Sequence, residues 1–500
     1  MSAVRTQFKK RTPGWIVACA EQMLVSAAFL LAVGVLGSQV MALPVTVALG
    51  VNLLIGSLLA FCFKTYSGDL RFSGVRDISR IARFSFCQLL IWLVVSRRGG
   101  FPVVNAAFSF ALLVGFRLLI KGTYTRVTGR YDKSFKNMMF RVNELTQLTI
   151  GSLIDRDEPD FRNEETGLCF YKGVVMVSGA AGSIGSEICR QLLQHGIRRI
   201  ILLDQSESEL FNLEFELRNR KEGVEIDLEV ASVRDRQRIE EVFARYKPDY
   251  VFHAAAYKHV PMMETMPSEA ILTNVLGTQV LADAAVRYHV QKFIMVSTDK
   301  AVNPTNVMGA TKSIAEIYIQ SLAKRTTGTR FITTRFGNVL GSNGSIVPLF
   351  IRQILRGGPV TITHPEVTRY FMTIPEAGRL VVEACVMGRG GEIFVFNMGK
   401  PVKIVEIALK LIGMAGYTEG KDIHIEYIGL RPGEKIHEEL FNASEDLMPT
   451  YHPTIMAART RDVDTALFNT QMGMLIEHAV QHRQMQARTL MHAMLPEFKQ

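Results

Sequence analysis

The segment Ser297–Lys312, which reads STDKAVNPTNVMGATK, concentrates side chains that can move protons. Thr298, Asp299 and Lys300 place a hydroxyl, a carboxyl and an amine side by side after the apolar run 292–296, and a second lysine closes the segment. General acid–base catalysis uses such groups, and a parallel α/β sheet gathers its ligands at the carboxyl ends of its strands. We therefore expect a catalytic site here. The alternative is a solvated pair of charges in a turn.

A glycine-rich turn lies upstream, between an apolar strand and a helical pattern, as in a dinucleotide site. Val174–Ser178 is apolar and is followed by GAAGSIG at 179–185. Gly179 permits the tight turn, Gly182 lets the backbone approach a pyrophosphate, and Gly185 allows the helix to pack closely on the strand. The free N–H groups at the start of the helix would bind the phosphates.

Acidic and small residues follow the next strands where the same site needs them. A second apolar strand ends in Asp204, nineteen residues after the last glycine, which suits the acid that binds the ribose of NAD. No arginine follows directly, which favours NAD over NADP. The strand at 250–253 runs into Ala254, Ala255 and Ala256, where larger side chains would collide with a dinucleotide. Further residues expected at the cofactor site are Ser183, Ile184, Ser232, Val233, Asn274, Ser297 and Lys312.

Strands alternate with helices throughout the middle of the chain. This alternation predicts an α/β fold, a Rossmann-type doubly wound parallel sheet, with a smaller C-terminal substrate-binding subdomain. It also predicts that the proton-transfer segment and the glycine-rich turn meet at one edge of that sheet.

The first quarter of the chain is different in character. Its four apolar runs are 15–37, 43–63, 81–95 and 102–120. A membrane-spanning helix needs about 20 apolar residues, so these runs predict a four-helix transmembrane anchor, although the third is short and contains Arg83. Glu21 and Gln22 interrupt the first run, and we expect them to face another helix or the membrane interface.

Charge is distributed unevenly along the chain. Residues 1–141 hold 18 Lys/Arg and 4 Asp/Glu, whereas the remainder holds 39 and 43. The basic excess flanks the apolar runs, which favours membrane lipid over nucleic acid as its partner. Its placement predicts four spans with both chain termini in the cytoplasm. The six cysteines have no metal-ligand spacing, so we expect no metal site and no disulfide framework.

Six motifs together resemble the nucleotide-sugar 4,6-dehydratases of polysaccharide biosynthesis, which are extended short-chain dehydrogenase/reductases. The resemblance covers about residues 140–460 and implies conversion of UDP-N-acetylglucosamine to a 4-keto-6-deoxy product at a bacterial inner membrane, with the catalytic domain in the cytoplasm. The motifs are GAAGSIG at 179–185, HAAAYKHVPMME at 253–264, STDKAVNPTNVMGATK at 297–312, RFGNVLGSNGSIVPLF at 335–350, HPEVTRYFMTIPEA at 364–377 and GLRPGEKIHEEL at 429–440.

The resemblance implies roles for the proton-transfer residues. Asp299 would be the acid for the departing C6 hydroxyl and Lys300 the base at C5, with the pKa of Asp299 raised and that of Lys300 lowered. Thr298 would bind near O4, and Lys312 would hold the nicotinamide ribose. Met308 stands where the superfamily's catalytic tyrosine would complete a Tyr-x-x-x-Lys pair. A thioether has no proton to exchange, but the membrane-bound branch of the family also resembles this sequence in having methionine here.

The resemblance also implies how the substrate is held. Arg369 and Arg431 would reach the UDP diphosphate, and Glu434 the uridine ribose; either arginine alone would otherwise be read as part of a surface salt bridge. The full set expected at the substrate is Lys258, His259, Asn338, Ser345, Val347, Arg369, Arg431 and Glu434.

Two other functions fit the same residues. A nucleotide-sugar 4-epimerase would need an O4 base that Met308 cannot supply, and a non-catalytic scaffold would bind NAD and UDP-sugar without turnover. A homo-oligomer is also possible. The expected divisions are a transmembrane anchor at 1–122, a connector at 123–172, an NAD-binding domain with the catalytic residues at 173–335, a UDP-sugar-binding region at 336–460 and a helical tail at 461–500.

Overall fold

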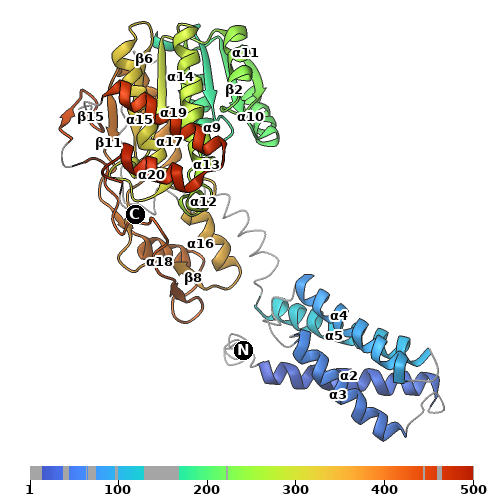
Figure 1. Cartoon of the computed structure of the whole chain (residues 1–500). Coiled ribbons are helices and arrows are strands. Elements are labelled where there is room, and N and C mark those ends of the chain that lie inside the picture. Colours follow the sequence, from blue (N-terminus) through green and yellow to red (C-terminus); the bar gives the residue numbers. More distant parts are fainter. Residues whose placement is uncertain are drawn as a thin grey trace. The chain divides into compact units, whose positions relative to one another are not determined.

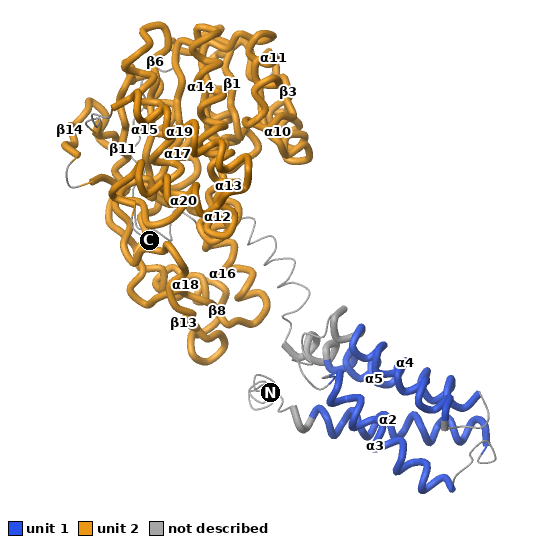
Figure 2. Tube along the Cα trace, viewed as in Figure 1, with its two compact units in different colours: residues 1–144 blue, residues 145–500 orange. Residues whose placement is uncertain are grey.

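The computed structural model of the chain (Figure 1) describes residues 14–37, 44–63, 65, 75–95, 100–128, 168–220, 223–442, 445–458 and 464–498. They belong to two compact units, residues 1–144 and residues 145–500, coloured blue and orange in Figure 2. Most of the predicted connector, 123–172, lies outside the described residues.

The first unit is helical. Its helices are α2 (Gly14–Leu36), α3 (Val45–Phe63), α4 (Val75–Val95) and α5 (Gly100–Thr128). Among the described residues, Val17–Leu36, Val45–Phe63 and Gly100–Ile120 are long and apolar enough to cross a membrane. Helix α4 begins before the apolar run that we expected and carries Arg80 and Arg83 in its first half. The apolar N-terminal region is thus three helices of spanning length plus a fourth, more polar helix.

Polar side chains meet inside this helical unit. The side chain of Glu21 on α2 is 3% exposed, and Arg117 on α5 donates to its Oε1 at 2.7 Å. Thr65 donates its hydroxyl to Glu21 Oε2, also at 2.7 Å. Elsewhere Asn52 on α3 accepts hydrogen bonds from Gln88, Trp92 and Asn105. The expectation that Glu21 faces another helix is confirmed.

Replacing Glu21 by alanine is expected to destabilise the helical unit by about 3 to 5 kcal/mol, because Arg117 would stay buried without a counter-charge. The measurement is the unfolding of the full chain in detergent, with Cys19→Ala, an exposed position on the same helix, as the control. The double variant Glu21→Ala/Arg117→Ala should recover part of the loss. Equal stability of Glu21→Ala and the control would contradict the buried pairing.

A nine-stranded sheet forms the centre of the second unit, in the order β14-β15-β11-β6-β5-β4-β1-β2-β3. The strands from β11 to β3 are parallel, whereas β15 pairs antiparallel with both β11 and β14. Chain order reverses where β1 pairs with both β2 and β4, which is where a doubly wound sheet binds its ligand. The strands are β1 (Val174–Ser178), β2 (Arg199–Asp204), β3 (Glu225–Val230), β4 (Tyr250–His253), β5 (Lys292–Val296), β6 (Arg330–Arg335), β11 (Ile393–Phe396), β14 (Leu447–Pro449) and β15 (Ile455–Ala458).

Helices cover both faces of the sheet, so its inner strands are buried on both sides and read as continuous apolar runs. One hydrophobic core lies under α9 (Ser183–Leu192), α10 (Glu207–Arg220) and α17 (Ile374–Met387). The other lies under α11 (Arg236–Tyr246), α14 (Gly277–Arg287), α15 (Val307–Arg325), α19 (Thr465–Val480) and α20 (Gln484–Met494). Figure 1 shows α19 and α20 in red, and they contact α15 and α13 (Pro267–Ala270). The C-terminal tail is therefore packed on its own chain.

A third, smaller core belongs to the C-terminal subdomain. It is built from α16 (Ile346–Leu355), β8 (Val360–Ile362), α18 (Ile404–Met414) and β13 (Ile425–Tyr427). Short pairings, β7 (Asn338–Val339) with β10 (Phe371–Met372) and β9 (Thr368–Arg369) with β12 (Val402–Lys403), connect it to the end of β6. The predicted fold class, apolar N-terminal helices before a mostly parallel Rossmann-type sheet with a smaller subdomain, is confirmed.

Candidate active site

The glycine-rich turn after β1 is shaped by contacts that leave no room for side chains. Gly179 has φ +70°, and a methyl group there would lie 2.5 Å from the backbone nitrogen of Ala255. A methyl group at Gly185 would overlap the carbonyl oxygen of Gly179. Helix α9 begins after Gly182 without a side-chain cap or an acidic residue in its first turn, so its first N–H groups remain available to an anion.

Asp204 supports the same turn. Its Oδ2 accepts a hydrogen bond from the backbone nitrogen of Ala181 and its Oδ1 from that of Ser206, each at 3.0 Å. The carboxylate thus lies at the carboxyl end of β2 beside the glycine-rich turn. On the other side of β1, which pairs with β4, the backbone nitrogen of Ala254 donates to the carbonyl oxygen of Ser178 at 2.9 Å. This bond places the small residues after β4 directly against the turn.

Three other residues expected at the cofactor have defined partners within the protein. Asn274 is fully buried, and its amide bonds to both the nitrogen and the oxygen of Tyr257 and to the hydroxyl of Thr311. It therefore shapes the loop after β4 rather than presenting a free group. Ser232 accepts from the backbone of Arg234. Val233 packs where Gly277 leaves space on α14.

Taken together, these residues fit a dinucleotide: a bare turn, an uncapped helix start, an acid at the end of β2 and small residues at the end of β4. Ser183 adds a contact that the sequence did not predict. Its hydroxyl accepts a hydrogen bond from the backbone of Asn343 at 3.0 Å. His259 lies against the same loop, because a methyl group at Gly344 would come within 2.5 Å of its ring. The loop 341–345 therefore contacts both the glycine-rich turn, at Ser183, and the ring of His259.

The predicted proton-transfer residues form one cluster at the carboxyl end of β5. Asp299 has no exposed surface, and its Oδ1 accepts from the hydroxyl of Thr298 at 2.8 Å and from Nζ of Lys300 at 2.9 Å. Asp299 Oδ2 is buried without a hydrogen-bond partner and faces the backbone of Gly337. Lys300 also donates to Asn338 Oδ1 at 3.1 Å.

Glu438 is a member of this cluster that the sequence did not reveal. It is 7% exposed, and its Oε1 lies 3.5 Å from Nζ of Lys300. Burial lowers the pKa of Lys300, but the carboxylates of Asp299 and Glu438 outweigh burial and raise that pKa above its usual value. The expectation that the pKa of Lys300 is lowered is therefore wrong for this state of the protein.

Helix α15 approaches this cluster closely at Gly309. A methyl group there would overlap the carbonyl oxygen of Lys300, and the helix is capped by Asn306, whose Oδ1 accepts from the nitrogen of Gly309 at 2.7 Å. Met308 is 3% exposed and packs in the core beneath α15. The missing tyrosine hydroxyl is thus replaced by an apolar contact.

Lys312 lies one turn further along α15. Its Nζ donates to the carbonyl oxygen of Val296 at 2.8 Å, and burial lowers its pKa to about 8. Val296 is the last residue of β5, and Ser297, which follows it, has a buried hydroxyl without a hydrogen-bond partner. Both side chains lie at the edge of the sheet where the glycine-rich turn also lies.

The C-terminal tail also supports the start of helix α15. Val307 is the first residue of α15, and its backbone nitrogen donates at 2.6 Å to Glu264, which lies in the motif after β4. Arg488 on α20 donates to Glu264 Oε2 at 3.1 Å. The start of α15 is therefore supported by a side chain from the tail, for which the sequence showed no chemistry.

The three cationic residues expected at the substrate differ in exposure. Arg369 is 6% exposed and donates to the carbonyl oxygens of Thr368, Lys435 and Ile436 at 2.7 to 3.0 Å. Its guanidinium therefore already holds the segment 434–438. Lys258 and Arg431 are exposed, and neither has an ion-pair partner among the residues that the structure describes.

Glu434, Ser345 and Val347 are also among the residues expected at the substrate. Glu434 Oε1 accepts from the hydroxyl of Thr363 at 2.9 Å and lies 3.4 Å from Nη2 of Arg369. Ser345 precedes α16, and its buried hydroxyl has no hydrogen-bond partner. Val347 is 1% exposed and packs in the core of the smaller subdomain, so only its backbone could face a ligand.

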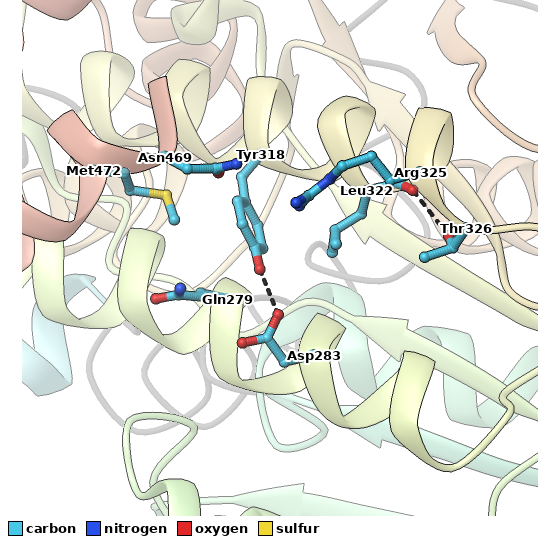
Figure 3. A pocket seen from close by; sticks show the side chains of 8 residues that line it. All are labelled: Gln279, Asp283, Tyr318, Leu322, Arg325, Thr326, Asn469 and Met472. Atoms are coloured by element: carbon cyan, nitrogen blue, oxygen red, sulfur yellow. Dashed lines mark hydrogen bonds between the residues drawn. The ribbon is translucent and has the colours of Figure 1, made fainter. Parts of the chain in front are cut away.

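A pocket of about 460 Å³ lies away from all of these residues, between α14, the C-terminal half of α15 and α19 (Figure 3). Tyr318 donates its hydroxyl to Asp283 across it. None of the proton-transfer residues lines it, and we assign it no part in the chemistry. Its lining residues are Gln279, Asp283, Tyr318, Leu322, Arg325, Thr326, Asn469 and Met472.

The chain is similar to several known proteins. The chain is 51% identical over 308 residues to the capsular polysaccharide biosynthesis protein CapD of Staphylococcus aureus, a match that covers 61% of this chain and 51% of that protein. The chain thus spans about half the length of this relative. An uncharacterized membrane protein of Methanocaldococcus jannaschii is 47% identical over 55% of this chain and 83% of its own length.

A named enzyme and a solved structure are similar as well. A protein named UDP-glucose 4-epimerase from Rickettsia prowazekii is 38% identical over 56% of this chain and 80% of its own length. The X-ray structure of Pen from Bacillus thuringiensis is 34% identical, with a TM-score of 0.54, and covers 58% of this chain and 90% of that chain. The family model described as polysaccharide biosynthesis protein matches residues 175–460, which include every residue expected from the sequence at the cofactor, proton-transfer and substrate sites. The chain is therefore a member of the polysaccharide biosynthesis protein family, with apolar N-terminal helices and a Rossmann-type fold.

Proposed function

We propose that the chain is a membrane-anchored, NAD-dependent UDP-N-acetylhexosamine 4,6-dehydratase that makes a UDP-4-keto-6-deoxy-hexosamine for glycan synthesis. The observation that carries this proposal is the cluster of Thr298, buried Asp299 and Lys300 at the end of β5, on a chain with Met308 in place of a tyrosine. An elimination needs an acid and a base close together, and this cluster holds both.

Each side chain has a proposed task. The glycine-rich turn, Asp204 and Lys312 would hold NAD, which would supply the hydride chemistry at sugar C4 and C6. Lys300 would remove the C5 proton, and Asp299 would give a proton to the departing C6 hydroxyl. Thr298, which bonds to Asp299, would lie near O4 and, with Asp299 or a water molecule, receive the O4 proton. The buried, water-poor setting of Asp299 favours proton transfer within the cluster over exchange with solvent.

Recognition of the UDP-sugar is proposed for the smaller subdomain. Arg431 and Lys258 are exposed cations suited to the diphosphate, and Glu434 would bind the uridine ribose. Arg369 would contribute indirectly, by holding the 434–438 segment in place through hydrogen bonds to its carbonyl oxygens. The basic residues beside the apolar helices would keep this domain on the cytoplasmic side of a bacterial inner membrane.

The second candidate is a nucleotide-sugar 4-epimerase, which the similarity to a protein of that name favours. An epimerase has no use for an acid and a base at C5 and C6, whereas this chain holds such a pair, Asp299 and Lys300, in direct contact. A scaffold that binds NAD and UDP-sugar without turnover is the third possibility, from a different class of function.

One incubation separates the three. Purified full chain in detergent is mixed with UDP-N-acetylglucosamine and the product is examined by mass spectrometry. A product lighter by one water supports the dehydratase. A product of equal mass that is a C4 isomer supports the epimerase, and bound NAD without turnover supports the scaffold.

Lys312 leads to a pH prediction for cofactor binding. Since its pKa lies at about 8, its ammonium is present below that pH and is lost above it. If this charge holds the nicotinamide ribose, NAD affinity should fall as the pH rises through about 8. The measurement is bound NAD against pH. Lys312→Met should bind weakly and without this dependence, and a flat profile for the unmodified chain would contradict the assignment.

A further inference from the structure

Lys300 is surrounded by as many acceptors as its ammonium has protons. Asp299 Oδ1 and Asn338 Oδ1 accept at 2.9 and 3.1 Å, and Glu438 Oε1 lies 3.5 Å away. Asp299 follows β5 and Asn338 follows β6 of the main sheet, whereas Glu438 comes from the C-terminal subdomain. Two carboxylates therefore face one amine, and the proposed mechanism uses only the first of them.

Several contacts hold Glu438 and the segment that carries it in place. Arg369 places its Nε 3.8 Å from Glu438 Oε1 and bonds to the carbonyl oxygens of Lys435 and Ile436. Just before this segment, Thr305 and Asn306 donate to the carbonyl oxygen of Gly433 at 3.1 and 3.0 Å.

The approach at that point is close. Gly433 has φ +75°, and a methyl group there would lie 2.6 Å from Cβ of Asn306. The segment that carries Glu438 is thus docked against the loop that follows Lys300.

We propose that Glu438 is a positioning residue for the elimination: its carboxylate keeps one proton on the Asp299–Lys300 pair and makes Lys300 a stronger base toward C5. This inference rests on the dehydratase function proposed above.

The proton balance of the step closes within the pair. The Lys300 ammonium first passes a proton to Asp299, which breaks an N–H bond, forms an O–H bond and leaves a neutral amine beside a neutral acid. Lys300 then takes the C5 proton while Asp299 gives its proton to the leaving C6 oxygen, which departs as water. The pair returns to its original ion-paired form, and no further donor or acceptor is required.

Glu438 acts on this pair through charge. The charged groups that face Lys300 are Asp299, Glu438 and Arg369, and Asn338 is the neutral neighbour. An opposite charge at such a distance shifts a pKa by about 1 to 3 units. Removal of the Glu438 charge should therefore let the pair lose its last proton at lower pH and should weaken Lys300 as a base.

The direct test is the ionisation of Lys300 in the full chain in detergent, with and without Glu438→Gln. Lys300 is 17% exposed, so trace acetic anhydride can reach its neutral amine, and mass spectrometry of the Lys300 peptide follows labelling against pH. We expect the labelling midpoint to fall by about 1 to 2 pH units in Glu438→Gln. Glutamine keeps the size and the oxygen acceptor of glutamate, and Glu438→Asp, which keeps the charge, should restore a midpoint near that of the unmodified chain.

The neighbouring residue provides a matched control. Glu439→Gln removes the same charge from the same segment, but the side chain of Glu439 is 51% exposed and pairs with Asn303 and Lys435. Its labelling midpoint should not move. An unchanged midpoint in Glu438→Gln, or equal shifts in both variants, would overturn the inference.

Activity provides a second readout. In Glu438→Gln, water loss from UDP-N-acetylglucosamine should acquire an alkaline decline at a pH where the unmodified chain is still active. A purely structural defect would lower the whole profile without moving it, and that outcome would count against the inference. A labelling shift without any water loss by the unmodified chain would instead refute the proposed dehydratase and leave the charge effect on Lys300 standing.

Discussion

Replacing Lys300 by alanine is expected to slow water loss from the UDP-sugar by about 10² to 10⁴-fold, the usual contribution of a general base. The side chain touches Asp299 and Asn338 and would be the base for the C5 proton. Oxidation at C4 does not need that base. Under single-turnover conditions the absorbance of reduced nicotinamide should therefore build up and persist, while mass spectrometry detects no dehydrated product.

The design of this test must separate chemistry from folding. Removal of Lys300 leaves Asp299 buried without its counter-charge, so Lys300→Gln, which keeps a donor toward Asp299, is measured as well. Retained NAD binding would show that the Rossmann domain is intact. Lys400→Ala, an exposed lysine in the turn after β11, is the matched control and should turn over normally. Unimpaired turnover in Lys300→Ala would refute the role of Lys300 at C5.

Replacing Gly309 by alanine is expected to reduce turnover by about 10²-fold, because a displacement of about 1 Å is enough to misalign reacting groups. The added methyl would overlap the carbonyl oxygen of Lys300 and lie 3.2 Å from Asn306 Oδ1, which caps the helix. Helix α15 would have to move away from the turn that holds Asp299 and Lys300. Overpacking of this kind also destabilises by about 1 to 3 kcal/mol.

The measurements are turnover of UDP-N-acetylglucosamine and thermal unfolding of the full chain. Gly413→Ala is the control, since it adds the same methyl group to helix α18 at a position with no atom within 4 Å. Glycine-to-alanine changes at open helical positions are neutral or stabilising, by up to about 1 kcal/mol. If Gly309→Ala behaves like Gly413→Ala, the close approach of α15 to Lys300 does not matter for catalysis.

Much of the catalytic domain was predictable from local patterns. Alternation of apolar strands with helices specifies a parallel sheet, and GAAGSIG after β1 specifies a turn that only small residues can form. Because carboxyl ends of parallel strands share an edge, the glycine-rich turn, Asp204 and the Thr298–Lys300 cluster were expected near one another. The apolar runs likewise predicted the N-terminal helices, but Arg80 and Arg83 make α4 more polar than the others.

Other features depended on contacts between segments far apart in the chain. The pairing of Glu21 with Arg117 requires two helices to pack, and the support of α15 by Arg488 requires the tail to fold back. A polar residue in an apolar run shows that a partner is needed, but it does not show which residue is the partner.

The sequence by itself determined which groups are present for the proposed chemistry: an acid, an amine and a hydroxyl after one strand, a glycine-rich turn after another, and no tyrosine at position 308. Only the tertiary structure decided the state of those groups. Folding buries Lys300, which lowers its pKa, but it also holds Asp299 against Lys300 and docks the C-terminal subdomain so that Glu438 lies nearby. The two carboxylates together raise the pKa of Lys300, which is opposite to the expected direction. The physical reason is that a pKa depends on every charge within a few ångströms, and the distance between residues in the chain says little about their distance in space.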